Sequence, residues 1–204
     1  MNDKRQQPQP NVRLRAILLA TEKRPEVLAE AKRLQGEIQS HAEIVRTALT
    51  GDEDISDVEA DLALVLGGDG SILRAARQMR HRQLPVVAIN MGKLGFLANI
   101  SAHELPALLS DYRAGLLHIA EHLMFECSLI QDGAVRQRQL GLNEVAVLAG
   151  TPFSIINVNL YVDSELATTY SCDGLIISTP IGSTAHCLSA GGPILRQTMQ
   201  AFVI

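Results

Sequence analysis

The sequence predicts an α/β first half with a doubly wound, mostly parallel sheet, followed by a second part that is β-rich and antiparallel. Up to about residue 116, short apolar runs alternate with segments of helical periodicity. That alternation is typical of a parallel sheet with helices on its faces. Beyond that point apolar and polar residues alternate with a period of two around tight-turn sequences, which indicates antiparallel strands.

The first half is expected to begin with a buried strand at residues 14–20, followed by a helix whose apolar positions recur every three or four residues. Thr21 is the expected cap of this helix, and Pro25 lies near its first turn. A later helix is expected to begin at Ser101, which forms a capping box with Glu104. The other expected elements are strands at residues 43–49, 62–66 and 85–90, a helix at 72–82 and an acidic loop at 51–61.

In the second half, the alternation that begins at residue 117 continues to Leu129 and meets the turn Asp132-Gly133. We expect a β-hairpin there, with a return run through residues 143–148. A further strand at 156–162 ends at the turn Asp163-Ser164, and residues 175–178 are expected to form one more. The predicted organisation is therefore a disordered lead-in at 1–12, an α/β nucleotide-binding domain at 13–116 and a β-rich domain at 117–204.

The composition excludes several classes of protein. The hydrophobic fraction of 47% and the charged fraction of 20% are ordinary for a globular chain. A net charge of -4 and an aromatic fraction of 3% argue against nucleic-acid binding. No apolar run approaches the roughly 20 residues of a membrane span, and the polar N-terminus lacks a signal-peptide core. We therefore expect a cytoplasmic protein with free thiols at Cys127, Cys172 and Cys187.

The strongest motif follows the expected strand at 62–66 and reads Gly67-Gly68-Asp69-Gly70-Ser71. Three glycines in four positions let the backbone turn sharply and bring its N–H groups close to an anionic ligand. A carboxylate in such a loop suits a kinase, where it either accepts the proton of the attacking hydroxyl or holds a divalent metal on the phosphates. The alternative is a tight turn in which Asp69 is merely solvated.

A second glycine-containing loop, Gly92-Lys93-Leu94-Gly95-Phe96-Leu97, follows the strand expected at 85–90. Loops at the C-terminal ends of parallel strands share one edge of the sheet, so this loop should lie beside Gly67–Ser71. Phe96 could cover a nucleotide ring or could pack in the core.

Two further segments are candidates for binding a polar ligand. Asn143-Glu144 offers an amide beside an acid, although this pair is weak by itself. Residues 171–174 and 178–185 collect glycines and small hydroxyl side chains, as in loops that hydrogen-bond a ligand. A purely structural loop is the alternative. The letters His118-x-x-Glu121-His122 match a zinc-peptidase motif, but that motif needs a helix, and the alternation here predicts a strand.

Taken together and in this order, GGDGS, GKLGFL, NEV and DGLIISTPIGSTAHCLSAGGP resemble the NAD kinase family. The last stretch is the most specific, since GGDG alone also occurs in diacylglycerol kinases, sphingosine kinases and phosphofructokinases. The resemblance implies an enzyme that moves the γ-phosphoryl of ATP to the 2′-hydroxyl of the adenosine ribose of NAD, with Mg²⁺ or Mn²⁺. It also implies an α/β domain followed by a β-rich one, and a homodimer or homotetramer without nucleic-acid or membrane partners.

The resemblance implies roles residue by residue. Asp69 matches the proton acceptor, Gly70 lies beside the dinucleotide and Arg74 meets its phosphates. Asn143 and Glu144 match the pair that holds NAD near the adenosine end, and Asp173 matches a further acid. The adenine-side loop corresponds to Thr184, Ala185, His186, Cys187, Leu188 and Ser189. No metal-ligating residue is assigned.

Two substitutions depart from the family pattern, because His186 replaces a usual Tyr and Ile181 replaces a usual Thr or Ser. Family members also continue beyond residues 201–204, so we expect a chain cut short, with an open sheet edge. Two other functions stay open: a non-catalytic dinucleotide-binding fragment, and a lipid or sugar kinase of the GGDG group.

Overall fold

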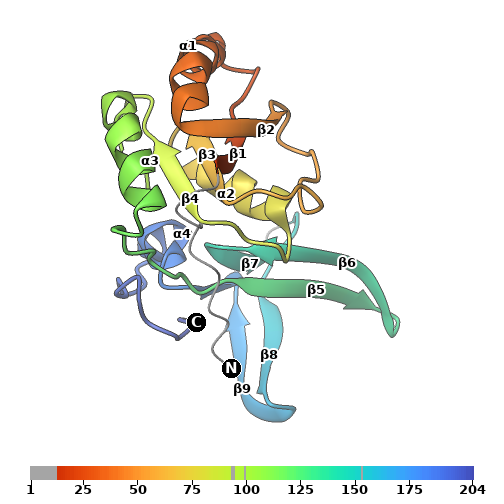
Figure 1. Cartoon of the computed structure of the whole chain (residues 1–204). Coiled ribbons are helices and arrows are strands. Elements are labelled where there is room, and N and C mark those ends of the chain that lie inside the picture. Colours follow the sequence, from red (N-terminus) through yellow and green to blue (C-terminus); the bar gives the residue numbers. More distant parts are fainter. Residues whose placement is uncertain (1–12, 93–94, 99, 153) are drawn as a thin grey trace. The chain divides into compact units, whose positions relative to one another are not determined.

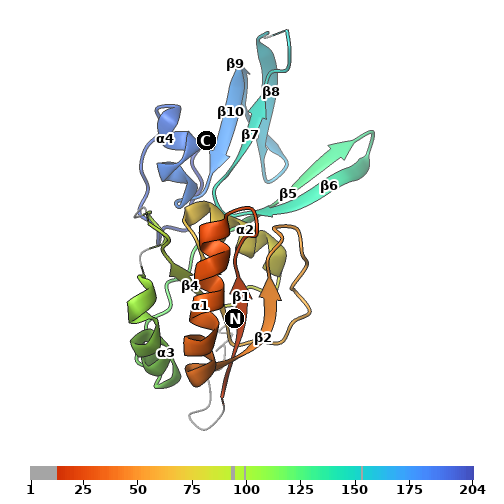
Figure 2. The same cartoon turned by 90° about the horizontal axis from the view of Figure 1, so that it is seen from above.

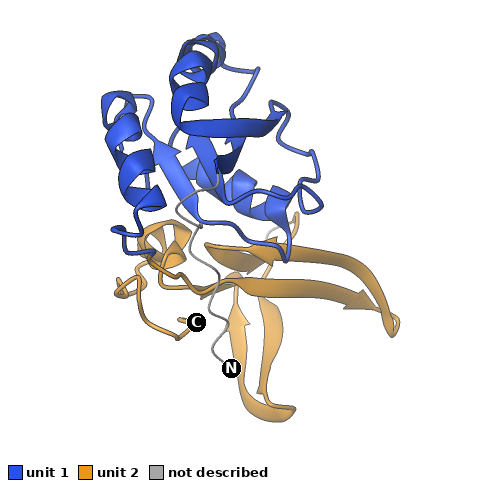
Figure 3. Cartoon of the chain, in the orientation of Figure 1, with its two compact units in different colours: residues 1–119 blue, residues 120–204 orange. Residues whose placement is uncertain are grey.

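The computed structural model describes residues 13–204 apart from 93–94, 99 and 153. The expected disordered lead-in therefore lies outside the described residues. The chain forms two compact units, one up to residue 119 and one from residue 120 (Figure 3). Within the described part of the chain, no helix combines the length and the apolar character needed to cross a membrane.

The first unit is built on a parallel sheet with the strand order β2-β1-β3-β4 (Figure 1). The strands are β1 (Leu14–Leu19), β2 (Ala42–Ala48), β3 (Leu62–Leu66) and β4 (Val86–Ile89). Every residue of β3 is buried, as expected of a strand covered on both faces. The predicted α/β class with a parallel sheet is confirmed.

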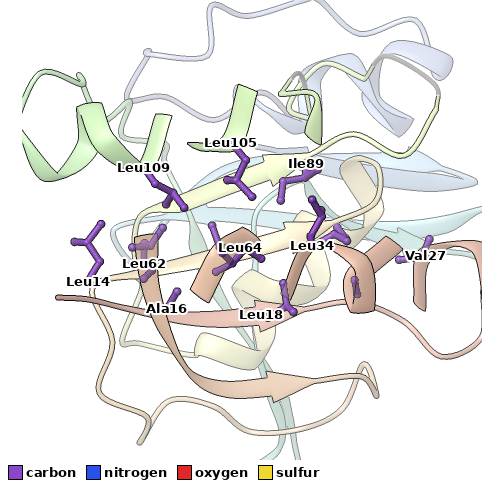
Figure 4. Packing of buried hydrophobic residues seen from close by; sticks show 14 residues of the cluster. Leu14, Ala16, Leu18, Val27, Leu34, Leu62, Leu64, Ile89, Leu105 and Leu109 are labelled. Carbon is purple, nitrogen blue, oxygen red and sulfur yellow. The ribbon is translucent and has the colours of Figure 1, made fainter. Parts of the chain in front are cut away.

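Two helices, α1 (Pro25–His41) and α3 (Leu105–Arg113), lie side by side (Figures 1 and 2). Their apolar side chains pack with alternate residues of the strands into one hydrophobic cluster (Figure 4). The helical contribution from α1 is Val27, Ala31, Leu34 and Ile38, each at most 2% exposed. The predicted recurrence of apolar residues every three or four positions is confirmed in this helix.

The start of α1 differs from the expectation. The helix begins at Pro25 with Arg24 as its N-cap, so the predicted cap at Thr21 is wrong. The Thr21 hydroxyl instead accepts a hydrogen bond from the Lys23 N–H at 3.4 Å, which forms a local turn before the helix. Proline favours the first helical position because its missing N–H would have no partner there. The proline therefore sets the start of the helix.

A second difference concerns α2 (Asp69–Met79), which begins three residues earlier than the predicted helix at 72–82. Gly67 and Gly68 alone connect β3 to the helix, and Gly68 is its N-cap. Asp69 and Gly70 therefore belong to the first helical turn and not to a loop. Because glycine is common in loops, the glycine-rich segment is assigned to a loop from sequence. The first turn of the helix is therefore missed.

The capping box before α3 is confirmed. The Glu104 carboxylate accepts a hydrogen bond from the Ser101 N–H at 2.9 Å. Hydrogen bonds from the Ser101 hydroxyl and N–H lower the pKa of Glu104. A short 3₁₀ turn at Ala102–Glu104 precedes α3.

Three antiparallel strand pairs make up the sheets of the second unit among its described residues (Figure 1). Two are hairpins, β5 (Phe125–Gln131) with β6 (Ala134–Gly141), and β8 (Ile156–Val162) with β9 (Glu165–Cys172). The third pairs β7 (Glu144–Leu148) with β10 (Gly174–Ser178). The chain then forms a 3₁₀ turn at Gly182–Thr184 and the short helix α4 (His186–Ser189).

Both predicted turns occur in the hairpins, but two expectations for this unit are wrong. Residues 116–124 form no strand, so the alternation there does not mark one. The return strand of the first hairpin is β6, whereas β7 pairs with β10, which is distant in sequence. The error arose because β6 carries polar residues on both faces and lacks the alternation that identifies a strand.

The core of the first unit yields a stability prediction. Leu64 is fully buried in β3, whereas Leu116 is 73% exposed. Leu64→Ala should lower the free energy of unfolding by about 3 kcal/mol, because it removes buried methyl groups and leaves a cavity. Leu116→Ala is the matched control and should change it by less than about 0.5 kcal/mol. Urea unfolding followed by far-ultraviolet circular dichroism measures both, and equal losses would contradict the packing described here.

Candidate functional site

The junction between β3 and α2 is a sharp turn that glycine makes possible. Gly67 is buried and has a φ of 141°, which is unfavourable for residues with a Cβ. A Cβ at this position would also overlap the Ser71 hydroxyl. The turn thereby places Asp69 one residue after the N-cap of α2, at the C-terminal edge of the sheet.

The Asp69 carboxylate binds the backbone of the second glycine-containing loop. Its Oδ2 accepts a hydrogen bond from the Phe96 N–H at 2.9 Å. Its Oδ1 accepts two more, from Leu97 N–H at 3.0 Å and Ala98 N–H at 3.1 Å. The start of α2 and the second glycine-containing loop are therefore neighbours, as the shared sheet edge predicts. The alternative of a merely solvated Asp69 is wrong.

Three other predicted site residues belong to this unit. Gly70 and Arg74 lie on α2, and Phe96 lies in the second glycine-containing loop. Gly70 is exposed in the first turn of α2, with open space where a Cβ would be. Phe96 is 67% exposed, so it does not pack in the core and its ring is available to a ligand. Arg74 is half-buried and covers Gly51, because a Cβ on Gly51 would overlap the Arg74 side chain. Lys93 and Leu94 lie outside the described residues.

In the second unit, the Asn143-Glu144 segment adjoins the loop that follows β10. The Thr179 N–H donates a hydrogen bond to the Asn143 carbonyl at 2.9 Å. Gly182 fits closely against the same carbonyl, which a Cβ would overlap. Two segments singled out in the sequence are therefore in contact, directly before β7 begins at Glu144.

The Glu144 carboxylate is partly buried, and one of its two oxygens lacks a hydrogen bond among the described residues. Its Oε2 is inaccessible to solvent and has no hydrogen-bond partner among the described residues. Burial raises the pKa of Glu144, and the nearby His186 opposes that rise. A buried acceptor without a donor costs stability, so such a group in a native fold asks for an explanation. A hydrogen-bond donor from a ligand would supply one.

The hydroxyl groups of residues 178–183 serve the loop itself. The Thr179 hydroxyl accepts from the Gly182 N–H at 3.1 Å. The Ser183 hydroxyl donates to the Pro180 carbonyl at 2.6 Å and accepts from the Leu195 N–H at 2.9 Å. Both side chains are fully buried. For these two residues the structural-loop alternative is correct, and hydroxyls spaced to bond their own backbone were the signal for it.

The predicted adenine-side loop divides into buried and accessible residues. Cys187 is buried against Gly192, so its thiol is not available to a ligand. The Thr184 hydroxyl donates to the Ile181 carbonyl at 3.1 Å. The accessible members are His186, Leu188 and Ser189, with Ala185 partly so. Asp173 is also exposed, at the turn between β9 and β10.

The chemistry available is that of a carboxylate with polar partners. Within the described ranges, no group of three or more His, Cys, Asp or Glu side chains is arranged to hold a metal ion. His118 and His122 lie in the irregular segment before β5, on neither a helix nor the predicted strand. The predicted site residues form two groups, one in each unit.

Comparison with known proteins identifies the relatives of this chain. Residues 16–116 match the ATP-NAD kinase N-terminal domain, and residues 142–204 match the ATP-NAD kinase C-terminal domain. The NAD kinase of Rhodopirellula baltica is 50% identical over 190 residues, which cover 93% of this chain and 61% of that protein. The chain therefore spans about three fifths of the length of this curated relative.

Two solved structures share the fold. An NAD kinase from Archaeoglobus fulgidus, in complex with ATP, has a TM-score of 0.66 at 28% identity and covers 93% of this chain and 70% of its own. A yeast NADH kinase complexed with NADH has a TM-score of 0.73 at 23% identity and covers 94% of this chain and 65% of its own. Because both domain matches follow each other along most of its length, the chain belongs to the ATP-NAD kinase family.

Proposed function

We propose that this chain carries the proton acceptor and much of the dinucleotide site of an NAD kinase. The reaction transfers the γ-phosphoryl of ATP to the 2′-hydroxyl of the adenosine ribose of NAD and yields NADP and ADP. Family membership supports the reaction class. The observation that carries the assignment is the Asp69 carboxylate, which loop amides hold in one orientation at the sheet edge.

Asp69 acts as the general base in this proposal. Its carboxylate takes the proton of the ribose hydroxyl while that oxygen bonds to the γ-phosphorus and the bond to the leaving ADP breaks. Phosphoryl transfer depends mainly on positioning and charge stabilisation, so a held carboxylate suits the task. A proton acceptor of this kind contributes about 10²–10⁴ to the rate.

The remaining site residues bind the nucleotide. Gly70 and Arg74 meet the phosphates, since Gly70 gives close access to the helix start and Arg74 supplies a cation. Phe96 offers an exposed ring face. Asn143 and Glu144 hold the adenosine end, where a ribose or base donor would satisfy the buried Glu144 oxygen. The other proposed contacts are Asp173, Thr184, Ala185, His186, Cys187, Leu188 and Ser189, although the buried Cys187 could contribute only through its backbone.

ATP is the proposed phosphoryl donor, with Mg²⁺ or Mn²⁺ as the divalent cation. The Archaeoglobus relative is a complex with ATP, and the yeast relative is a complex with NADH. These two complexes support ATP and a nicotinamide dinucleotide as the ligands. A cation that arrives on ATP is held largely by phosphate oxygens and water and needs few protein ligands. A homodimer or homotetramer and a cytoplasmic location stay predictions.

A non-catalytic dinucleotide-binding fragment remains the second candidate. The chain spans 61% of the length of the Rhodopirellula relative, and the assay below decides between dinucleotide binding alone and catalysis. A lipid or sugar kinase of the GGDG group is not favoured, since both family matches are to NAD kinase domains.

The proposed reaction is tested by incubating the purified chain with ATP, MgCl₂ and NAD, and measuring NADP with an NADP-specific dehydrogenase. The wild-type chain should form NADP. Asp69→Asn should lower kcat by about 10²–10⁴-fold, because the amide accepts no proton. Asp111→Asn, an exposed carboxylate of α3, is the matched control and should keep full activity. Near-full activity of Asp69→Asn would contradict the role of Asp69, and NAD binding without NADP formation would favour the non-catalytic candidate.

The partly buried Glu144 side chain determines how stability should depend on pH. Because burial raises its pKa in the folded chain, the unfolded chain binds fewer protons between the two pKa values. Stability should therefore fall as pH rises from the unfolded to the folded pKa, and the deficit should persist at neutral pH. Glu144→Gln should unfold at a higher urea concentration than the wild type at neutral pH, with the difference vanishing in acid. The same variant should bind NAD more weakly.

Glu165→Gln is the control for this prediction, since Glu165 is an exposed carboxylate in the same unit. Its urea midpoint should follow that of the wild type at each pH. A Glu144→Gln chain that is less stable than the wild type at neutral pH would show that the carboxylate is satisfied within the fold.

A further inference from the structure

The hydrogen bonds of Asp69 use its two oxygens unequally. A carboxylate offers about four lone-pair sites, two on each oxygen. In the described part of the chain, Oδ1 accepts from both Leu97 and Ala98, whereas Oδ2 accepts from Phe96 alone. Oδ1 is therefore saturated, and Oδ2 retains the lone pair that can receive another hydrogen bond.

The donors belong to a segment that is itself anchored. Just beyond them, Ile100 forms a parallel bridge with Ile89 of β4. The Asn90 N–H donates to the Ile100 carbonyl at 2.7 Å, and the Ile100 N–H donates to the Ala88 carbonyl at 3.3 Å. Ala98 is fully buried. The N–H groups therefore project from backbone tied to the sheet that also positions α2.

Gly95 leaves the room that the carboxylate occupies. A Cβ built on Gly95 would overlap both carboxylate oxygens of Asp69 and the carbon between them. Any side chain at this position must displace the carboxylate or the loop. No positive φ is involved, so the requirement for glycine comes from the close approach alone.

We propose that residues 95–98 are a positioning element for Asp69, in which three backbone amides orient its carboxylate and present the open lone pair of Oδ2 to the substrate hydroxyl. Gly95 is accordingly a positioning residue that touches no substrate. This inference rests on the proposed role of Asp69 as the proton acceptor. It adds that the orientation of the Asp69 carboxylate and the structure of residues 95–98 depend on each other. A substitution in either should therefore disturb the other.

The element predicts a distinctive response to substitution of Asp69. Asp69→Ala removes the acceptor for all three amides. Asp69→Asn keeps an oxygen that can accept from Leu97 and Ala98, but its NH₂ group then faces the Phe96 N–H, and two donors cannot pair. The Asn variant therefore loses the proton acceptor and also one of the three loop contacts.

Amide hydrogen exchange, resolved by NMR on the full 204-residue chain without nucleotide, tests the contacts directly. Asp69→Ala should reduce the protection of Phe96, Leu97 and Ala98 by roughly ten- to hundredfold, as expected when a hydrogen bond to a charged group is lost. Asp69→Asn should reduce the protection of Phe96 alone. Unchanged protection of all three amides in Asp69→Ala would overturn the proposal.

Kinetics of Gly95→Ala test the consequence for catalysis while Asp69 itself remains intact. Displacement of the carboxylate by about 1 Å should lower kcat by about 10²-fold. kcat and kcat/KM for NAD should fall by the same factor, because the lost interaction belongs to the transition state. Gly36→Ala is the matched control, since Gly36 is exposed on α1 with nothing within 4 Å of a Cβ. Wild-type kcat in Gly95→Ala would overturn the proposal.

The two experiments separate this inference from the proposed function. If the amides depend on Asp69 but the wild-type chain forms no NADP, the positioning contact stands and the proposed reaction fails. If the wild-type chain forms NADP but the amides are indifferent to Asp69, the reaction stands and the positioning element fails.

Discussion

The candidate site depends on the contact between one carboxylate and the backbone of a second loop. Asp69 begins α2 directly behind a buried strand, and its carboxylate receives three N–H groups from residues 96–98. Both partners are tied to the same sheet, through β3 on one side and β4 on the other. Glycine is needed on both sides, at Gly67 for the turn and at Gly95 for the approach of the carboxylate. Among the described residues, the fold thus orients the proposed proton acceptor with three backbone amides.

The fold of the first unit was predictable because its signals are local. The apolar spacing of α1 and the uniformly apolar run of β3 identify their own buried faces. The second unit was less predictable, because strand pairing is not local. β6 lacks alternation, and β7 finds its partner β10 far along the chain, so neither pairing could be read from neighbouring residues.

The site was predicted as a set of residues, but their interactions were not. The motif identifies Asp69 and its glycines. The hydrogen-bond partners of Asp69 are main-chain N–H groups, which every residue except proline has and which a sequence motif therefore cannot identify. The hydroxyl-rich loop shows the opposite error. Thr179 and Ser183 have the composition of ligand-binding residues, yet their side chains are buried and bond their own loop. Composition indicates which side chains have groups that could bind a ligand. Burial then determines which of those groups a ligand can reach.

The central claim is that the Asp69 carboxylate receives the proton of the adenosine 2′-hydroxyl. A crystal structure of the chain with bound NAD tests it most directly, through the distance from Asp69 Oδ2 to the ribose O2′. We expect this distance to be about 2.6–3.2 Å, or to be bridged by one water, with the loop amides still bound to the carboxylate. An ordered dinucleotide whose 2′-oxygen lies beyond the reach of that side chain would contradict it.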